Sequence, residues 1–201
     1  MASSKPMRDF ELEVFFSRWE FNAKHHMTAS DIESLSVSEL LELASPEDRD
    51  RFNHLHLGYT ETWGSPSLRH AIADTYDDVR PENVLCLAGA GEGLYTVARV
   101  LLARYDHVIV PTPNYQSAET VPLSVCDVSG VPMRYDSSAG WRLDVDDIKS
   151  ALRPNTKLLS LNFPHNPTGF ILPTGDFEQL IEICRERGIY ILSSQFWNIS
   201  A

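Results

Sequence analysis

The sequence of 201 residues contains few cysteines, and none of them is clustered. Cys86, Cys126 and Cys184 form no Cys-x-x-Cys pair, and their odd number leaves at least one of them unpaired. Each lies among apolar residues, as in the segment VLCLAG. A disulfide framework or a cysteine-based zinc site is therefore not expected. Instead, we expect buried, reduced thiols in a cytoplasmic compartment.

Positive charge and long apolar runs are also scarce. Lysine and arginine number 17 against 28 acidic residues, which gives a net charge of -11. Nucleic acids and anionic membranes require a basic footprint, so neither is expected as a partner. No apolar run approaches the roughly 20 residues of a membrane span. The N-terminal segment MASSKPMRDFELEVFF carries acids where a signal peptide has its apolar core, so no such peptide is expected.

The histidine pairs lack the neighbours that a metal site requires. His25 and His26 are adjacent, and His54 and His56 are two positions apart. Neither pair has cysteines or carboxylates at ligand spacing, so surface or interface histidines are expected and no metal site is.

Helical and strand-like segments alternate through most of the chain. Ser36 and Glu39 have capping-box spacing, and Ser65-Pro66 is a helix start from which apolar residues continue on one face to Val79. The polar segment SPEDRDRFNHLHLGY between them has the composition of a connector. Further helices are expected at 94–102, 115–124, 144–152 and 174–188, and strands or extended segments at 84–87, 107–111, 125–135, 156–164 and 189–194.

This alternation predicts an α/β fold with a mostly parallel sheet and flanking helices, preceded by a short helical N-terminal segment. Ligands bind such sheets at the carboxyl ends of the strands. Three groups of residues are expected there. Gly89-Ala90-Gly91 opens a helix and suits an anion, Tyr115 suits stacking on a planar ligand, and Asn166 lies in a proline-braced turn. Each also has an ordinary interpretation, as a tight turn, a loop aromatic or an Asn-Pro turn.

The order of these motifs carries a resemblance. Tyr59, Gly64, Leu68 and Arg69 fit the pattern Y-x4-G-x3-LR, and they precede the segments GAGEGL, PNY and HNPTG. With this set the chain resembles the class I/II (fold type I) pyridoxal-phosphate-dependent aminotransferases from about residue 10 to 194. An unrelated doubly wound nucleotide-binding protein is the weaker interpretation, because the dinucleotide fingerprint is absent.

The resemblance implies pyridoxal 5'-phosphate as the cofactor and gives each residue a role. Gly89, Ala90 and Gly91 would bind its phosphate, Tyr115 would stack on its ring and Asn166 would bind the ring hydroxyl. Tyr59 would reach the phosphate of the partner's cofactor in a homodimer, and His165 would be structural. The expected domains are an N-terminal segment that is part of the small domain, 1–57, and the N-terminal portion of the large cofactor-binding domain, 58–201. The C-terminal part of the large domain and the rest of the small domain are expected to be absent from this sequence.

Two features depart from the family pattern. Ser194 stands where the resemblance implies an aspartate that keeps the pyridine nitrogen protonated. The resemblance implies a Schiff-base lysine some tens of residues after the Ser194 position, which falls past Ala201, and the last lysine of this sequence is Lys157, so no catalytic residue is assigned.

Three functions remain open at this point. The full-length form would transfer an amino group between an amino acid and a 2-oxo acid, and this chain would itself be inactive. It could instead be a non-catalytic module that binds the cofactor weakly or pairs with a full-length relative. Lyase or cyclase chemistry with the same cofactor is the third. The tail SSQFWNISA, residues 193–201, begins to diverge from the family where the aspartate is implied, and it is expected to come from a retained intron, a frameshift or a misassembled gene model.

Overall fold

The computed structural model describes residues 6–28 and 33–194, which divide into two compact units. The sheet unit comprises the described residues up to Phe16 and those from Leu87 onward, and the helical unit comprises Ser17–Cys86. Helix α1 (Glu11–Trp19) belongs in part to each. This division follows contacts within the chain, and the expected boundary at residue 58 remains a prediction.

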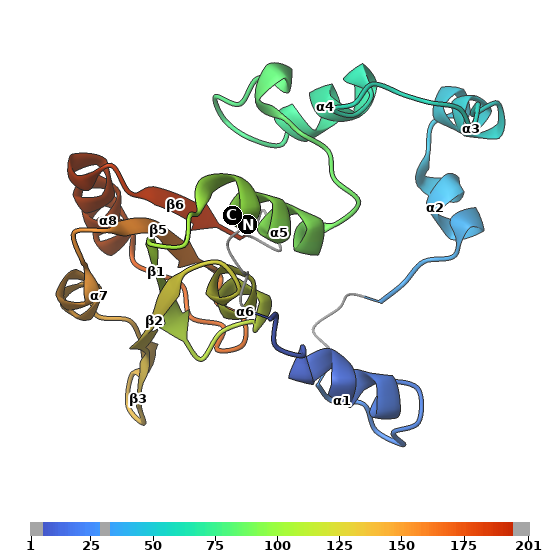
Figure 1. Cartoon of the computed structure of the whole chain (residues 1–201). Coiled ribbons are helices and arrows are strands. Elements are labelled where there is room, and N and C mark those ends of the chain that lie inside the picture. The colour runs from blue at the N-terminus through green and yellow to red at the C-terminus, as the bar shows by residue number, and fades with distance from the viewer. Residues whose placement is uncertain (1–5, 29–32, 195–201) are drawn as a thin grey trace. The chain divides into compact units, whose positions relative to one another are not determined.

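The helical unit contains short helices that begin at local sequence signals. They are α2 (Val37–Leu43), α3 (Pro46–Asn53), α4 (Pro66–Ala73) and the 3-10 turn η1 (Pro81–Asn83) (Figure 1). The predicted capping box of α2 is confirmed, because the Glu39 N–H donates to Ser36 Oγ at 3.2 Å and the Ser36 N–H donates to Glu39 Oε2 at 2.7 Å.

Two predictions for the helical unit were wrong. The segment interpreted as a connector contains α3, which starts at Ser45-Pro46 with the Asp48 N–H bonded to Ser45 Oγ. The helix from Ser65 ends at Ala73 and does not reach Val79. The residues that follow, from Asp74 to Asp78, include three aspartates, which favour turns over helices, and Asp78 has a φ of 59°.

The sheet unit is built on four parallel strands in the order β2-β1-β5-β6. These are β1 (His107–Thr112), β2 (Asp127–Pro132), β5 (Thr156–Leu161) and β6 (Tyr190–Ser193). A separate antiparallel hairpin, which the sequence did not reveal, joins β3 (Arg134–Asp136) to β4 (Gly140–Arg142). The predicted α/β fold with a mostly parallel sheet is confirmed.

Helices cover both faces of this sheet, as Figure 1 shows. Helices α5 (Ala90–Leu101) and α6 (Ser117–Leu123) pack on one face, where Ala98 and Val121 meet Val108. Helices α7 (Val145–Ala151) and α8 (Thr174–Arg187) pack on the other, where Ile148 and Leu180 meet strand residues. Gly188 ends α8 in the left-handed conformation, with a φ of 65°, as its position predicts.

The strand expected before Gly89 does not form. Residues 84–87 belong to no helix or strand, and Leu85 and Leu87 are exposed. A strand needs a neighbouring strand to bind its N–H and C=O groups, and the described residues provide none at this point. Two backbone bonds from this stretch are recorded among the described residues, from the Val84 N–H to the Pro81 carbonyl at 3.2 Å and from the Cys86 N–H to the Trp63 carbonyl at 2.9 Å, and neither partner lies in a strand.

The three cysteines are free thiols. Cys126 and Cys184 are buried as predicted, and Cys86 is only partly buried. Within the ranges 6–28 and 33–194, no helix has the length and apolar character to cross a membrane, and no group of three or more His, Cys, Asp or Glu residues could hold a metal ion.

Candidate functional site

The loops that follow β1 and β5 lie side by side at the carboxyl edge of the sheet, because these strands are parallel neighbours. His165 joins the two loops. Its ring is 2 % exposed, its Nδ1 lies 2.8 Å from Thr168 Oγ1, and it forms a hydrogen bond with the Pro113 backbone. Burial lowers the pKa of His165, and the bond to Pro113 opposes that shift. These contacts agree with the structural role expected of this residue.

Asn166 lies in the loop after β5 with its side chain only partly buried. The loop closes on itself, because the Gly169 N–H donates to the His165 carbonyl at 2.7 Å and Gly169 adopts a φ of 72°. The peptide bond between Asn166 and Pro167 is cis. Among the described residues, no hydrogen bond to the Asn166 side-chain amide is recorded, so this amide is available to a ligand.

Tyr115 lies in the loop after β1 and is half-buried. Phe10, which precedes α1, contacts its ring edge-on, with 5.2 Å between the centroids and 75° between the planes. Burial raises the pKa of Tyr115, and the carboxylate of Glu13, which forms a hydrogen bond with the phenol, raises it further. The ring that sequence reasoning assigned to a cofactor is therefore held by the N-terminal part of the same unit.

Gly89, Ala90 and Gly91 form the exposed N-terminus of α5. Gly89 is the N-cap and offers no side chain, while the Glu92 carboxylate accepts the Ala88 N–H at 2.7 Å. Within the described chain no partner is recorded for the N–H groups of Ala90 and Gly91. A Cβ added at Gly89 or Gly91 would meet nothing within 4 Å. Open space thus adjoins the positive end of a 12-residue helix, a suitable environment for an anion.

Helix α5 begins at the same edge of the sheet. A small cavity of about 10 Å³ is lined by Leu94 of α5, Ser160 near the end of β5 and Leu192 of β6, together with residues of α6. Leu94 lies one turn after Gly91, so the first turn of α5 lies near the carboxyl ends of β5 and β6. The structure therefore brings Gly89–Gly91, Tyr115 and Asn166 to one edge.

Ser194 follows β6 at this edge, and both its backbone N–H and its carbonyl are hydrogen-bonded to residues at or just after the end of β5. Its N–H donates to the Leu161 carbonyl at 2.9 Å, and its carbonyl accepts the Asn162 amide at 2.9 Å when that amide is oriented to satisfy both its atoms. The position offers a hydroxyl where a carboxylate is needed to protonate a bound pyridine. Asn162 was not singled out from the sequence, although a polar residue directly after a buried strand was a usable signal.

Tyr59 belongs to the helical unit, and its side chain is fully exposed. It is therefore not part of the group that the sheet unit assembles. Its predicted role concerns a second subunit and remains a prediction.

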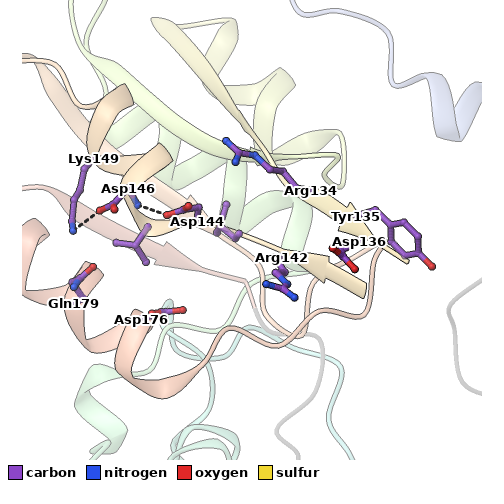
Figure 2. A pocket seen from close by; sticks show the side chains of 11 residues that line it. Arg134, Tyr135, Asp136, Arg142, Asp144, Asp146, Lys149, Asp176 and Gln179 are labelled. Carbon is purple, nitrogen blue, oxygen red and sulfur yellow. Dashed lines mark hydrogen bonds and ion pairs between the residues drawn. The ribbon is translucent and has the colours of Figure 1, made fainter. Parts of the chain in front are cut away.

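A second, larger cavity of about 730 Å³ lies between the hairpin β3–β4 and the first turns of α7 and α8 (Figure 2). Most of its charged groups have partners within the sheet unit. Lys149 pairs with Asp146 at 2.8 Å, and the Asp146 N–H donates to Asp144 Oδ1 at 2.8 Å. Arg134 binds Asp147 at 2.7 Å. The groups that line this open cavity do not converge on a reactive group, so the candidate site remains at the carboxyl edge of the sheet.

Comparison with known proteins identifies the family. The family model for aminotransferase class I and II matches residues 34–195. An aspartate aminotransferase of Sulfurisphaera tokodaii is 33% identical over 150 residues, which are 70% of this chain and 37% of that protein. An arginine–pyruvate transaminase of Pseudomonas aeruginosa is also 33% identical, over 145 residues, with the same coverage of both chains.

Solved structures show the same likeness. A PLP-dependent aminotransferase from Streptococcus suis superposes with a TM-score of 0.84 at 31% identity, covering 93% of this chain and 50% of that one. The chain thus spans between about a third and a half of the length of these proteins. Because the family model covers most of the sequence, the chain belongs to the class I and II aminotransferase family.

Proposed function

We propose that this chain forms the cofactor-binding half-site of an aminotransferase, in which pyridoxal 5'-phosphate is held at the carboxyl edge of the sheet. The carrying observation is that Tyr115 and Asn166 come from adjacent parallel strands, beside the open N-terminus of α5. The whole protein would transfer an amino group between an amino acid and a 2-oxo acid. Lyase or cyclase chemistry uses the same cofactor, and no observation favours it.

The residues present suit most of the cofactor. The N–H groups of Ala90 and Gly91 would bind the phosphate, with room at both glycines for close approach. The Asn166 amide would donate to the ring hydroxyl, and the Tyr115 ring would cover one face of the pyridine. When bound, pyridoxal phosphate draws electrons away from the substrate carbon and so makes its proton acidic.

The fit fails at the pyridine nitrogen. The Ser194 hydroxyl has no charge with which to hold that nitrogen protonated, and Asn162 is a neutral amide. The described residues therefore supply binding and orientation of the cofactor but not its activation. This is why we assign cofactor binding to this chain and leave amino transfer to the whole protein.

A homodimer completes the proposal. Tyr59 is fully exposed and would reach the cofactor phosphate of a second subunit. Sedimentation of the chain alone and with cofactor checks this. A dimer whose affinity for the cofactor falls on Tyr59→Phe substitution supports the shared site, whereas a monomer that binds the cofactor fully removes that role from Tyr59.

The proposal is tested by measuring the binding of pyridoxamine 5'-phosphate with isothermal titration calorimetry. This amine form has no aldehyde, so it does not react with lysine side chains. We expect binding that requires the phosphate, so that pyridoxamine without phosphate binds far more weakly. Asn166→Ala should weaken binding by about tenfold, the size of one lost hydrogen bond to a buried polar group.

Asn155→Ala is the matched control. Asn155 lies before β5, at the opposite edge of the sheet, and its amide donates to the Tyr105 carbonyl at 2.7 Å. Its loss should leave binding unchanged. A folded chain that does not bind pyridoxamine phosphate, or binds it equally well without Asn166, would contradict the proposed site.

A further inference from the structure

The side chain of Gln116 makes two hydrogen bonds that attach the N-terminal segment to the loop after β1. The Glu11 N–H donates to Gln116 Oε1 at 2.9 Å, and Gln116 Nε2 donates to the Asp9 carbonyl at 2.7 Å. Both functions of the amide are used, on backbone groups that lie 105 and 107 positions away in the sequence. The arrangement imitates the pairing of a neighbouring strand and fixes the backbone on both sides of Phe10.

Fixing this backbone places two side chains on Tyr115. The Phe10 ring meets Tyr115 edge-on, and Glu13 in the first turn of α1 forms a hydrogen bond with the phenol. The Tyr115 side chain is thus restrained at its ring and at its hydroxyl. Residues Arg8–Glu13, hereafter the clasp, hold it from one side.

Arg8, at the N-terminal end of the clasp, makes a weaker contact. Arg8 lies 4.0 Å from Glu119, whose carboxylate also lies 3.4 Å from the Asn114 amide. Asn114 donates to the Pro111 carbonyl at 3.1 Å as well. The clasp therefore contacts Tyr115 and Gln116 in the loop after β1 and Glu119 in the first turn of α6.

We infer that Gln116 is a positioning residue, which orients the Tyr115 ring for contact with the cofactor by holding the clasp against it. The inference rests on the proposed function, because it concerns the same ring. A half-buried aromatic side chain in a loop has several rotamers, and restraining it before the ligand arrives lowers the entropy lost on binding. Without the hydrogen bonds of Gln116, Phe10 and Glu13 are no longer held against Tyr115. The Tyr115 ring is then not oriented before the cofactor binds.

The first experiment compares Gln116→Ala with Asn155→Ala in the intact chain. Each substitution removes a side-chain amide bonded to a distant backbone carbonyl in the same unit. We expect Gln116→Ala to weaken binding of pyridoxamine 5'-phosphate by about three- to tenfold, the scale of one aromatic contact. Asn155→Ala should bind as the unchanged chain does. Equal binding by Gln116→Ala and the unchanged chain would overturn the inference.

A double-mutant cycle shows whether Gln116 acts through Tyr115. When Tyr115→Ala is already present, Gln116→Ala should cause no further loss of binding, because the ring that it positions is gone. An undiminished three- to tenfold loss in that background would mean that Gln116 affects the site by another route, and the positioning role would be rejected.

A readout without the cofactor separates failure of this inference from failure of the proposed function. Aromatic NMR cross-peaks between Phe10 and Tyr115 should be present in the unchanged chain and lost in Gln116→Ala. If these cross-peaks depend on Gln116 but the unchanged chain binds no pyridoxamine phosphate, the proposed function fails and takes the positioning role with it. If the chain binds and the cross-peaks persist in Gln116→Ala, only the positioning role is overturned.

Discussion

The two compact units use apolar residues in opposite ways. Of the hydrophobic residues that are buried within the described chain, only Ala73 and Val84 lie in the helical unit. In that unit Phe21 is 91 % exposed and Leu57 is 93 % exposed, whereas Ile109 and Leu180 of the sheet unit are completely buried. Both units contain large apolar residues, yet among the described residues only those of the sheet unit form core clusters.

The comparison shows that local sequence signals can start a helix without providing a buried core. Caps at Ser36, Ser45 and Ser65 are enough to start helices of seven or eight residues. A core requires a second layer, which the sheet unit gains by pairing strands far apart in the sequence and covering both faces with helices.

The largest expected difference comes from two leucines. Leu159 in β5 is 1 % exposed, so Leu159→Ala should lower the free energy of unfolding by about 2–5 kcal/mol through lost burial and a residual cavity. Leu57→Ala should change it by no more than about 0.5 kcal/mol. Urea denaturation of both variants measures this, and a comparable loss for Leu57→Ala would break the contrast between the units.

Gly64 tests whether the helical unit has any specific packing. It has a φ of +103°, and an added Cβ would lie 2.4 Å from Cys86 Sγ. Gly64→Ala should therefore destabilise this part of the unit by about 1–3 kcal/mol, seen as faster hydrogen exchange of the Cys86 amide. Gly175→Ala at the start of α8, where nothing lies within 4 Å, should stay within about 0.5 kcal/mol of the unchanged chain. Unaltered exchange in Gly64→Ala would show the contact to be unimportant.

The helix N-cap Ser45 tests whether the helical unit and the sheet unit unfold separately. Ser45→Ala removes the acceptor of the Asp48 N–H and should cost helix α3 about 1 kcal/mol. Amide exchange in residues 46–53 should accelerate, while the urea midpoint of the sheet unit stays unchanged. A shift of that midpoint would mean that the two units unfold together.

The smallest effect concerns the pH dependence of the sheet unit. His107 is completely buried in β1, with Nδ1 2.8 Å from Thr156 Oγ1 and Nε2 2.8 Å from Ser129 Oγ. Burial lowers its pKa below the ordinary value of 6.5, nearby Arg153 lowers it further, and Asp127 opposes both. Below pH 6.5 the unfolded chain therefore binds a proton that the folded chain resists, so stability falls as the pH falls through this range.

The measurement is the slope of unfolding free energy against pH, in the unchanged chain and in His107→Gln. The slope should be shallower in the variant. It should not vanish, because burial also lowers the pKa of His165. An identical slope in both proteins would exclude His107 as a source of the acid sensitivity.

Much of the sheet unit could be predicted because its signals are local. Apolar runs end at Pro113, Asn162 and Ser194, and these places became the carboxyl edge that carries the candidate site. Ser45-Pro46 has the same start signal as Ser65-Pro66, so α3 was predictable and its polar composition misled us. The contacts of Gln116 with the N-terminal segment could not be predicted, because no local pattern relates residues more than a hundred positions apart.

The order of the strands also has a consequence for the rate of folding. His107 in β1 pairs with Asp127 in β2, which follows through a short connection, but also with Thr156 in β5, which arrives only after the hairpin and α7. Closing that longer loop costs chain entropy before any contact compensates for it. The β1–α6–β2 segment should therefore form early, and the arrival of β5 should limit the rate, as in other folds dominated by distant pairings.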